Sequence, residues 1–157
     1  MQKITPCLWF DNQAEEAMNF YVSIFKNSKV LSVNRYGEGA SMPKGTVMTA
    51  NFELDGQAFT ALNGGSMFKF SPAISFVVRC ATQTEVDDYW AKLSAGGKEN
   101  QCAWLDDKFG VSWQIVPDVL IEFLSDPDPA KAGRVMQAMM QMTKIDIAVL
   151  KQAYEQP

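Results

Sequence analysis

The chain contains the same strand-and-helix pattern twice, and this repeat constrains its fold more than any other feature. Residues 4–10 form a short apolar run that predicts a strand. Residues 13–25 then carry apolar side chains at the i, i+3, i+4 and i+7 spacing of a helix with one buried face. Residues 73–80 and 82–94 repeat both features. The sequence therefore predicts one fold unit used twice.

Two different shifts of the numbering align the copies. A shift that takes residue 20 to residue 89 places Phe20-Tyr21 on Tyr89-Trp90. The helix starts, Asn12 with Glu15 and Thr82 with Glu85, both have the form of a capping box, and they align with a shift that is one residue longer. We therefore expect one residue to be gained or lost between strand and helix.

Further strands follow each predicted helix. In the first half they are separated by a loop at 37–45 and by Asp55-Gly56, a strong signal for a tight hairpin. A shift that takes Asn63 to Gln114 aligns the later strands, and it indicates that the second unit has lost or shortened one strand. The predicted strands are 30–36, 46–54 and 57–63 in the first half and 101–105 and 111–116 in the second.

Residues beyond Pro117 have the pattern of helices. A short helix is predicted at 119–124, and Asp128-Pro129 is a typical cap and first-turn pair for the next. A last helix is predicted from Thr143–Asp146 to about Tyr154. The fold class is α+β, with domain boundaries at 1–117 for the paired units (1–66 and 67–117) and 118–157 for a helical extension.

Charge and composition exclude several classes of partner. The 157 residues have a net charge of −4 and no basic cluster, which argues against nucleic acid. No segment approaches the ~20 apolar residues of a membrane helix, and no signal-peptide pattern is present. Three widely spaced cysteines indicate reduced thiols and a cytoplasmic location.

The absence of histidine is the most informative single count. It excludes Ser-His-Asp and Cys-His catalysis within this chain. It also removes the commonest nitrogen ligand of zinc, iron and nickel. Any catalysis would use carboxylates, Lys, Tyr, Cys or bound water.

Several short motifs together resemble one known family. The chain looks like the PhnB-like branch of the vicinal oxygen chelate superfamily, which includes glyoxalase I, bleomycin-resistance proteins and extradiol dioxygenases; the branch often has the label 3-demethylubiquinone-9 3-methyltransferase. The motifs are Pro6-Cys7-Leu8-Trp9-Phe10, Ala14-Glu15-Glu16-Ala17, Asn63-Gly64-Gly65, Ile74-Ser75-Phe76, Glu85-Val86-Asp87 and Asp107-Lys108-Phe109-Gly110-Val111-Ser112-Trp113-Gln114-Ile115.

The resemblance implies that two βαβββ-type units form a cupped mixed sheet that holds a divalent metal through His and Glu. In this chain the Glu position is Gln114 and its repeat partner is Asn63, and a neutral amide binds a hard cation far less well than a carboxylate. The first strand offers Cys7 or Thr5, and the fifth offers Ser75. We therefore expect no metal site and no cofactor. The methyltransferase label lacks support, because Gly37-Glu38-Gly39 lies between two predicted strands rather than between a strand and a helix.

Strand alternation and the polar side chains predict the lining of the cup. If polar residues mark its interior, the site has aromatic walls and a few hydrogen-bonding amides, as small-molecule sites do. Alternatively, the two tryptophans are core residues and the amides face water at strand ends. The predicted lining is Cys7, Trp9, Phe59, Asn63, Ser75, Trp104 and Gln114.

Two further features have ordinary explanations. Cys7 has no His, Lys or Arg beside it in sequence, so we expect a buried, inert thiol rather than a nucleophile. The methionines of the predicted helix after Pro129 are interpreted as core or subunit contact rather than as an adaptable binding surface.

The resemblance implies two classes of function. The first is a metal-free protein that binds a small, partly aromatic ligand, as a homodimer. The alternative is a metal-dependent lyase, isomerase or dioxygenase with non-histidine ligands. A structural interaction module also remains open.

Overall fold

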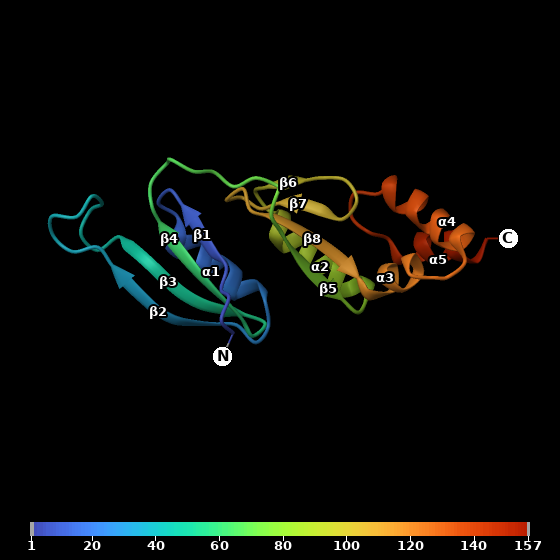
Figure 1. Ribbon diagram of the computed structural model, residues 1–157, viewed down its shortest axis with the longest axis horizontal. Coiled ribbons are helices and arrows are strands. Elements are labelled where there is room, and N and C mark those ends of the chain that lie inside the picture. The colour runs from blue at the N-terminus through green and yellow to red at the C-terminus, as the bar shows by residue number, and fades with distance from the viewer. Residues whose placement is uncertain (1, 157) are drawn as a thin grey trace. The chain divides into compact units, whose positions relative to one another are not determined.

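The computed structural model describes residues 2–156, which form two compact units (Figure 1). The first unit extends to Phe70 and the second begins at Ser71, so the C-terminal helices belong to the second unit. Within the described residues, no helix has the length and apolarity needed to cross a membrane. The elements are β1 (Cys7–Phe10), α1 (Ala14–Ile24), β2 (Lys29–Arg35), β3 (Val47–Leu54), β4 (Gln57–Asn63), β5 (Ser75–Cys80), α2 (Gln83–Ser94), β6 (Lys98–Glu99), β7 (Trp104–Asp106), β8 (Ser112–Pro117), α3 (Asp118–Leu124), α4 (Pro129–Met140) and α5 (Ile147–Glu155).

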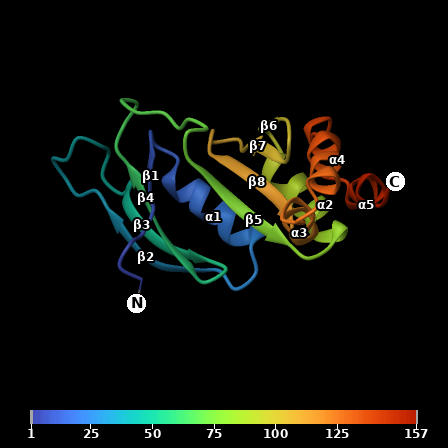
Figure 2. The same ribbon diagram turned by 45° about the vertical axis from the view of Figure 1, so that its right-hand side comes forward.

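The first unit is a four-stranded sheet with one helix on one face. Its strand order is β1-β4-β3-β2, with β1 parallel to β4 and the other pairs antiparallel. Figure 2 shows α1 lying along one side of this sheet. Alternate residues of β1, β3 and β4 face α1 and are buried, among them Leu8, Phe52 and Phe59, and the last two stack with ring centroids 5.6 Å apart. The other face of the sheet is not covered by α1; we call it the first open face.

The hairpin between β3 and β4 forms as predicted. Asp55 and Gly56 have φ values of 48° and 78°, as the two central residues of a type I′ turn require. Gly56 tolerates this conformation because it has no Cβ. The turn fixes the register of β3 against β4 and therefore decides which side chains reach each face.

The second unit repeats this arrangement in a reduced form. Its order is β5-β8-β7-β6, again with one parallel pair, β5 and β8. The predicted shortening is confirmed, since β6 has two residues. The predicted cap of α2 is also present: the Thr82 side chain accepts a hydrogen bond from Glu85 N, and Glu85 Oε2 accepts one from Ala81 N. The α+β class and the repeated order of elements are thus confirmed.

The C-terminal helices α3, α4 and α5 pack on the second unit around a core of their own (Figure 1). The buried side chains of this core are Ala103, Val116, Leu120, Val135, Ile145 and Leu150. Met139 and Met142 pack against it, whereas Met136 and Met140 are exposed, so the predicted methionine cluster is only partly core.

The chain between α4 and α5 is fastened to the rest of the unit at two places. The Gln83 side chain donates to Ile145 O and accepts from Ile147 N. Cys102 and Ala103, both with positive φ, donate their backbone N–H groups to the carbonyls of Met142 and Thr143. The extension is therefore tied through backbone groups as well as through its core.

Candidate functional site

The first open face consists of side chains aligned in rows across the four strands. Partner residues on neighbouring strands share a face, so the register gives each row directly. We call the two rows at its centre the Ser32 row and the Asn34 row. The Ser32 row is Ser32, Asn51, Thr60 and Cys7, and the Asn34 row is Asn34, Thr49, Leu62 and Trp9.

Hydrogen bonds join the polar members of each row. Thr60 Oγ1 donates to Asn51 Oδ1 at 2.7 Å, and Asn51 Nδ2 donates to Ser32 Oγ at 2.9 Å. In the other row, Asn34 Nδ2 donates to Thr49 Oγ1 at 3.2 Å. These side chains are exposed or half-buried, so the face presents an ordered array of hydroxyl and amide groups.

Trp9 is the last residue of the Asn34 row, and its indole contacts the segment that follows β4. Its indole Nε1 donates to Gly65 O at 2.9 Å, and its ring meets that of Phe68 edge-on with centroids 5.0 Å apart. A Cβ on Gly64 would lie 2.3 Å from a Trp9 ring carbon. Gly64 is therefore required for the indole to fit, and Trp9 offers a ligand its ring surface rather than its N–H.

Phe59 and Asn63 lie on the opposite face of the sheet. They do share a face with each other, but that face is the one covered by α1, where they are 5% and 1% exposed. The prediction that polar residues mark the cup interior is wrong for Asn63, because its side chain caps the start of α1. Asn63 Oδ1 accepts from Ala14 N at the start of α1, and Asn63 Nδ2 donates to Val47 O.

The predicted capping box of α1 is consequently wrong. The residue before the helix is Gln13, which makes no capping hydrogen bond through its side chain. A helix start needs acceptors for its first N–H groups, and here Asn63 supplies one from a strand 49 residues away. Such a cap leaves no local signal in the sequence.

Replacing Asn63 with Ala should destabilise the first unit by about 2–3 kcal/mol, because a buried N–H and a buried carbonyl both lose their partner. Urea unfolding followed by circular dichroism measures this change. The matched control is Asn12→Ala, at the exposed residue expected from sequence to cap the helix, which should change stability by less than about 0.5 kcal/mol. Equal effects of the two substitutions would contradict this assignment.

The second unit also has an open face, and it brings together three predicted site residues. Trp104 and Gln114 are register partners on β7 and β8, and Gln114 Nε2 donates to Ser75 Oγ at 2.9 Å. Beside them, Ser112 Oγ donates to Asp106 Oδ1 at 2.8 Å. Ser75, Trp104 and Gln114 thus form one cluster.

The sheet registers correct the repeat alignment. Phe10 and Cys80 are the buried last residues of β1 and β5, so these strands align with a shift of 70, as the helix starts suggested. Cys7 pairs with Thr60, and the equivalent Val77 pairs with Gln114. The structural counterpart of Gln114 is therefore Thr60, not Asn63. Aligning the two amides displaced the strands by an odd number of residues, which exchanges the faces.

Thr60, Asn51 and Ser32 were not among the predicted site residues. The signal for Asn51 was present, because residues 49–54 alternate strictly between polar and apolar side chains, as a strand with one open face does. The pattern becomes informative only when the hairpin register shows which residues lie side by side.

The thiols of Cys7 and Cys80 are not activated. Cys7 is exposed rather than buried as expected, and partial desolvation raises the pKa of its thiol. Burial, followed by the charges of Glu85 and Asp118, raises the pKa of Cys80 to about 12. Both thiols therefore remain protonated at neutral pH, and a thiolate nucleophile is not favoured at either position.

The residues at the expected metal positions do not fit a divalent metal. The resemblance implies ligands from the first and last strands of each unit, and the residues expected there are Cys7 or Thr5, Asn63, Ser75 and Gln114. The sheet registers instead place Thr60 opposite Cys7 and Val77 opposite Gln114. Neutral hydroxyl, amide and aliphatic side chains are poor ligands for such an ion, and the raised pKa of Cys7 disfavours the thiolate that would bind one. Among residues 2–156, no group of three or more His, Cys, Asp or Glu side chains is placed to hold a metal.

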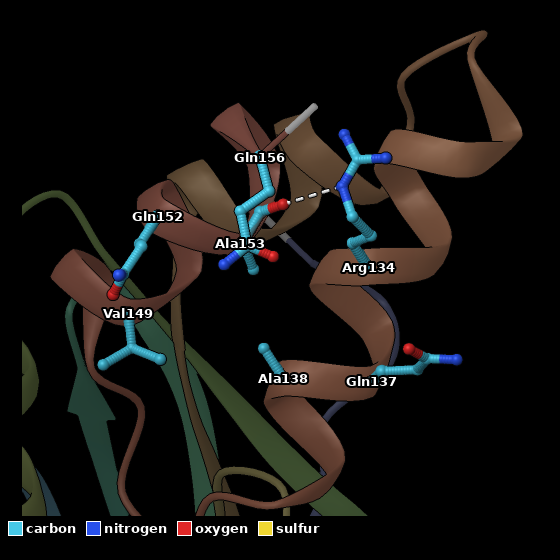
Figure 3. Close-up of a pocket in the computed structure, with 7 residues that line it drawn as sticks. All are labelled: Arg134, Gln137, Ala138, Val149, Gln152, Ala153 and Gln156. Atoms are coloured by element: carbon cyan, nitrogen blue, oxygen red, sulfur yellow. Dashed lines mark hydrogen bonds between the residues drawn. The ribbon is translucent and has the colours of Figure 1, made fainter.

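A separate hollow of about 370 Å³ lies between α4 and α5 (Figure 3). Its floor includes Ala138, Val149 and Ala153. Arg134 Nε donates to Ala153 O at 3.0 Å, and Arg134 Nη2 donates to Tyr154 O. The guanidinium therefore caps the C-terminal end of α5. The remaining rim is made of glutamine side chains, and Gln137 points away from the hollow in Figure 3. The open faces of the sheets are the better candidate site.

Comparisons with known proteins agree with this architecture. The family model described as 3-demethylubiquinone-9 3-methyltransferase matches residues 2–116, which ends before α3 begins. Among curated proteins, none matches the chain. The chain is similar to a solved Bacillus cereus structure called a PhnB protein, with 41% identity and a TM-score of 0.70 over 74% of this chain and 99% of that one.

Two more distant structures share the fold alone. PA1353 from Pseudomonas aeruginosa is 19% identical, with a TM-score of 0.62 over 75% of this chain and 100% of that one. The fosfomycin resistance protein FosX from Listeria monocytogenes is 18% identical, with a TM-score of 0.56 over 80% and 98%. The family model and the Bacillus cereus structure show that the chain belongs to the PhnB-like family described as 3-demethylubiquinone-9 3-methyltransferase.

Proposed function

We propose that this protein binds a small organic molecule on its open sheet faces without a metal ion and without catalysing a reaction. The observation that carries the proposal is the set of neutral side chains that pair on the first and last strands of each unit, Cys7 with Thr60 and Val77 with Gln114. Hydroxyl, amide and indole groups recognise ligands by hydrogen bonding and ring contact. They neither hold a Lewis acid nor transfer protons at neutral pH.

The surroundings support binding rather than catalysis. Asp106 is a carboxylate on the open face of the second unit, and it accepts a hydrogen bond from the hydroxyl of Ser112. A single carboxylate does not make an acid–base couple. The Cys7 thiol is held in its protonated form. Methyl transfer also lacks its usual binding turn, since Gly37-Glu38-Gly39 connects the strands β2 and β3.

Metal removal should leave the protein unchanged. We expect elemental analysis of the purified, tag-free protein to find no stoichiometric transition metal, and EDTA to leave the melting temperature within about a degree, because a bound metal would stabilise the folded state by mass action. A fall of several degrees with EDTA would contradict the proposal. It would favour the alternative, a metal-dependent lyase, isomerase or dioxygenase in which Asp106 is the first ligand to test.

Native mass spectrometry tests ligand binding itself. We expect a retained organic molecule, or a mass shift on incubation with a ligand found by thermal-shift screening. The variant Thr60→Val, in the open face of the first unit, should bind that molecule at least about tenfold less tightly, because the change removes a hydroxyl group that the proposal places against the ligand. We also propose a homodimer, and the same native spectra measure its mass.

A further inference from the structure

The first open face has no unpaired ionic group along its two central rows. Lys29 and Glu53 lie at one end of this face and pair with each other at 3.7 Å. Arg35 is the register partner of Val47, and its side chain lies on the side of α1. Its two terminal guanidinium nitrogens donate hydrogen bonds to the carboxylate of Glu15. The last member of the Ser32 row, Cys7, has a raised pKa and is therefore neutral. A ligand lying on the Ser32 and Asn34 rows meets no formal charge.

The hydrogen bonds of the Ser32 row also fix what the row can donate and accept. Thr60 donates to Asn51, and Asn51 donates to Ser32. Ser32 accepts through its oxygen and keeps its own proton for an acceptor outside the row, while the Thr60 oxygen keeps a lone pair for a donor. A ligand with alternating donors and acceptors matches this row, and hydroxyl groups provide both functions on one atom.

Apolar contact is provided by the far end of the Asn34 row. Leu62 and Trp9 are register partners there, and the Trp9 N–H is already bonded to Gly65 O. The indole can therefore contribute its ring surface but not a hydrogen bond. An aromatic group on the ligand is the natural partner for this end of the face.

We propose that the first open face binds an uncharged, polyhydroxylated ligand that carries an aromatic group, such as an aryl glycoside. The inference rests on the proposed function, since it names the ligand class of the same site. A charged ligand is disfavoured because it would give up hydration without gaining an opposite charge. A neutral polyol exchanges its bonds to water for bonds to the Ser32 row at little cost.

A matched pair of probes tests this selectivity. Phenyl β-D-glucoside and phenyl β-D-glucuronide differ only in a hydroxymethyl group and a carboxylate. Titration of the ¹⁵N-labelled full chain should move the Asn51 side-chain amide and the backbone amides of β2, β3 and β4. The glucoside should bind at least about tenfold more tightly than the glucuronide, which corresponds to one pair of unmatched polar contacts.

Three variants assign the effect to the row. Asn51→Asp replaces the amide with a charge of nearly the same shape, and Thr60→Val removes one hydroxyl at constant volume; both should weaken glucoside binding at least about tenfold. Asn12→Asp makes the same chemical change at an exposed residue of the same unit and should leave the affinity unchanged.

Several results would overturn the inference. They are equal or tighter binding of the glucuronide, unchanged glucoside affinity in both row variants, and absence of shifts with either probe. In each case a molecule retained in the native mass spectrum would still support the proposed binding function. A stoichiometric metal would instead remove the proposed function itself.

Discussion

Replacing Asp107 with Ala should destabilise the second unit by about 3–5 kcal/mol, because several buried donors lose their acceptor at once. Asp107 is 3% exposed. Its Oδ1 accepts from the backbone N–H groups of Phe109 and Val111, and its Oδ2 accepts from Trp113 Nε1 at 2.9 Å. This one carboxyl group shapes the loop between β7 and β8 and positions an indole of the core.

Denaturant unfolding followed by tryptophan fluorescence measures this loss, since three of the four tryptophans, at 90, 104 and 113, belong to the second unit. The control is Asp107→Asn, which keeps an acceptor for the two backbone donors and loses the bond to Trp113. Its cost should be smaller, about 1–2 kcal/mol. If the Ala and Asn variants were equally stable, the loop hydrogen bonds would not be the source of the effect.

The sequence was sufficient to predict the order of elements, because each depends on local signals. The helical spacing in residues 13–25 and 82–94 matches α1 and α2 to within a residue or two at each end. The Asp55-Gly56 turn and the Asp128 cap, whose side chain accepts from Ala130 N, are local features and were predicted correctly. The β6 strand was missed, since two residues are too few to show any period.

The faces of the strands could not be predicted in the same way. Alternation correctly grouped Phe59 with Asn63, but it cannot say which group faces the helix. Asn63 is polar and buried because it caps α1 from a strand that is distant in sequence, and no local sequence pattern predicts such a cap. The same uncertainty led to the pairing of Asn63 with Gln114, where sheet register gives Thr60.

The candidate site was accordingly predicted in part. Ser75, Trp104 and Gln114 come together because they lie on strands whose order the repeat already implied. Three members of the Ser32 row, Ser32, Asn51 and Thr60, escaped prediction because they lie on three different strands and are ordinary polar residues when taken singly. Their significance lies in the hydrogen bonds that join them, and these bonds can be inferred only once the register is known.

Gly97→Ala should be nearly as damaging as the loss of Asp107, because the two positions belong to one close crossing of the backbone. A Cβ on Gly97 would lie 2.1 Å from the carbonyl oxygen of Asp106 and 2.7 Å from the carbonyl carbon of Asp107. Backbone atoms cannot rotate away as a flexible side chain can, so the start of β6 and the loop after β7 would have to separate. We expect a loss of about 2–4 kcal/mol, at or above the usual cost of overpacking.

Gly133→Ala, in the same unit, should instead increase the free energy of unfolding. Gly133 lies inside α4, and an added Cβ there would meet no atom within 4 Å. Alanine should stabilise the helix by about 0.5–1 kcal/mol, since it loses less conformational entropy on folding. Thermal and urea unfolding of the two variants should therefore shift in opposite directions from the parent. If the Gly97→Ala protein were as stable as the parent, β6 would have moved away from Asp106 without a loss of free energy of unfolding. The close backbone crossing would then not stabilise the second unit.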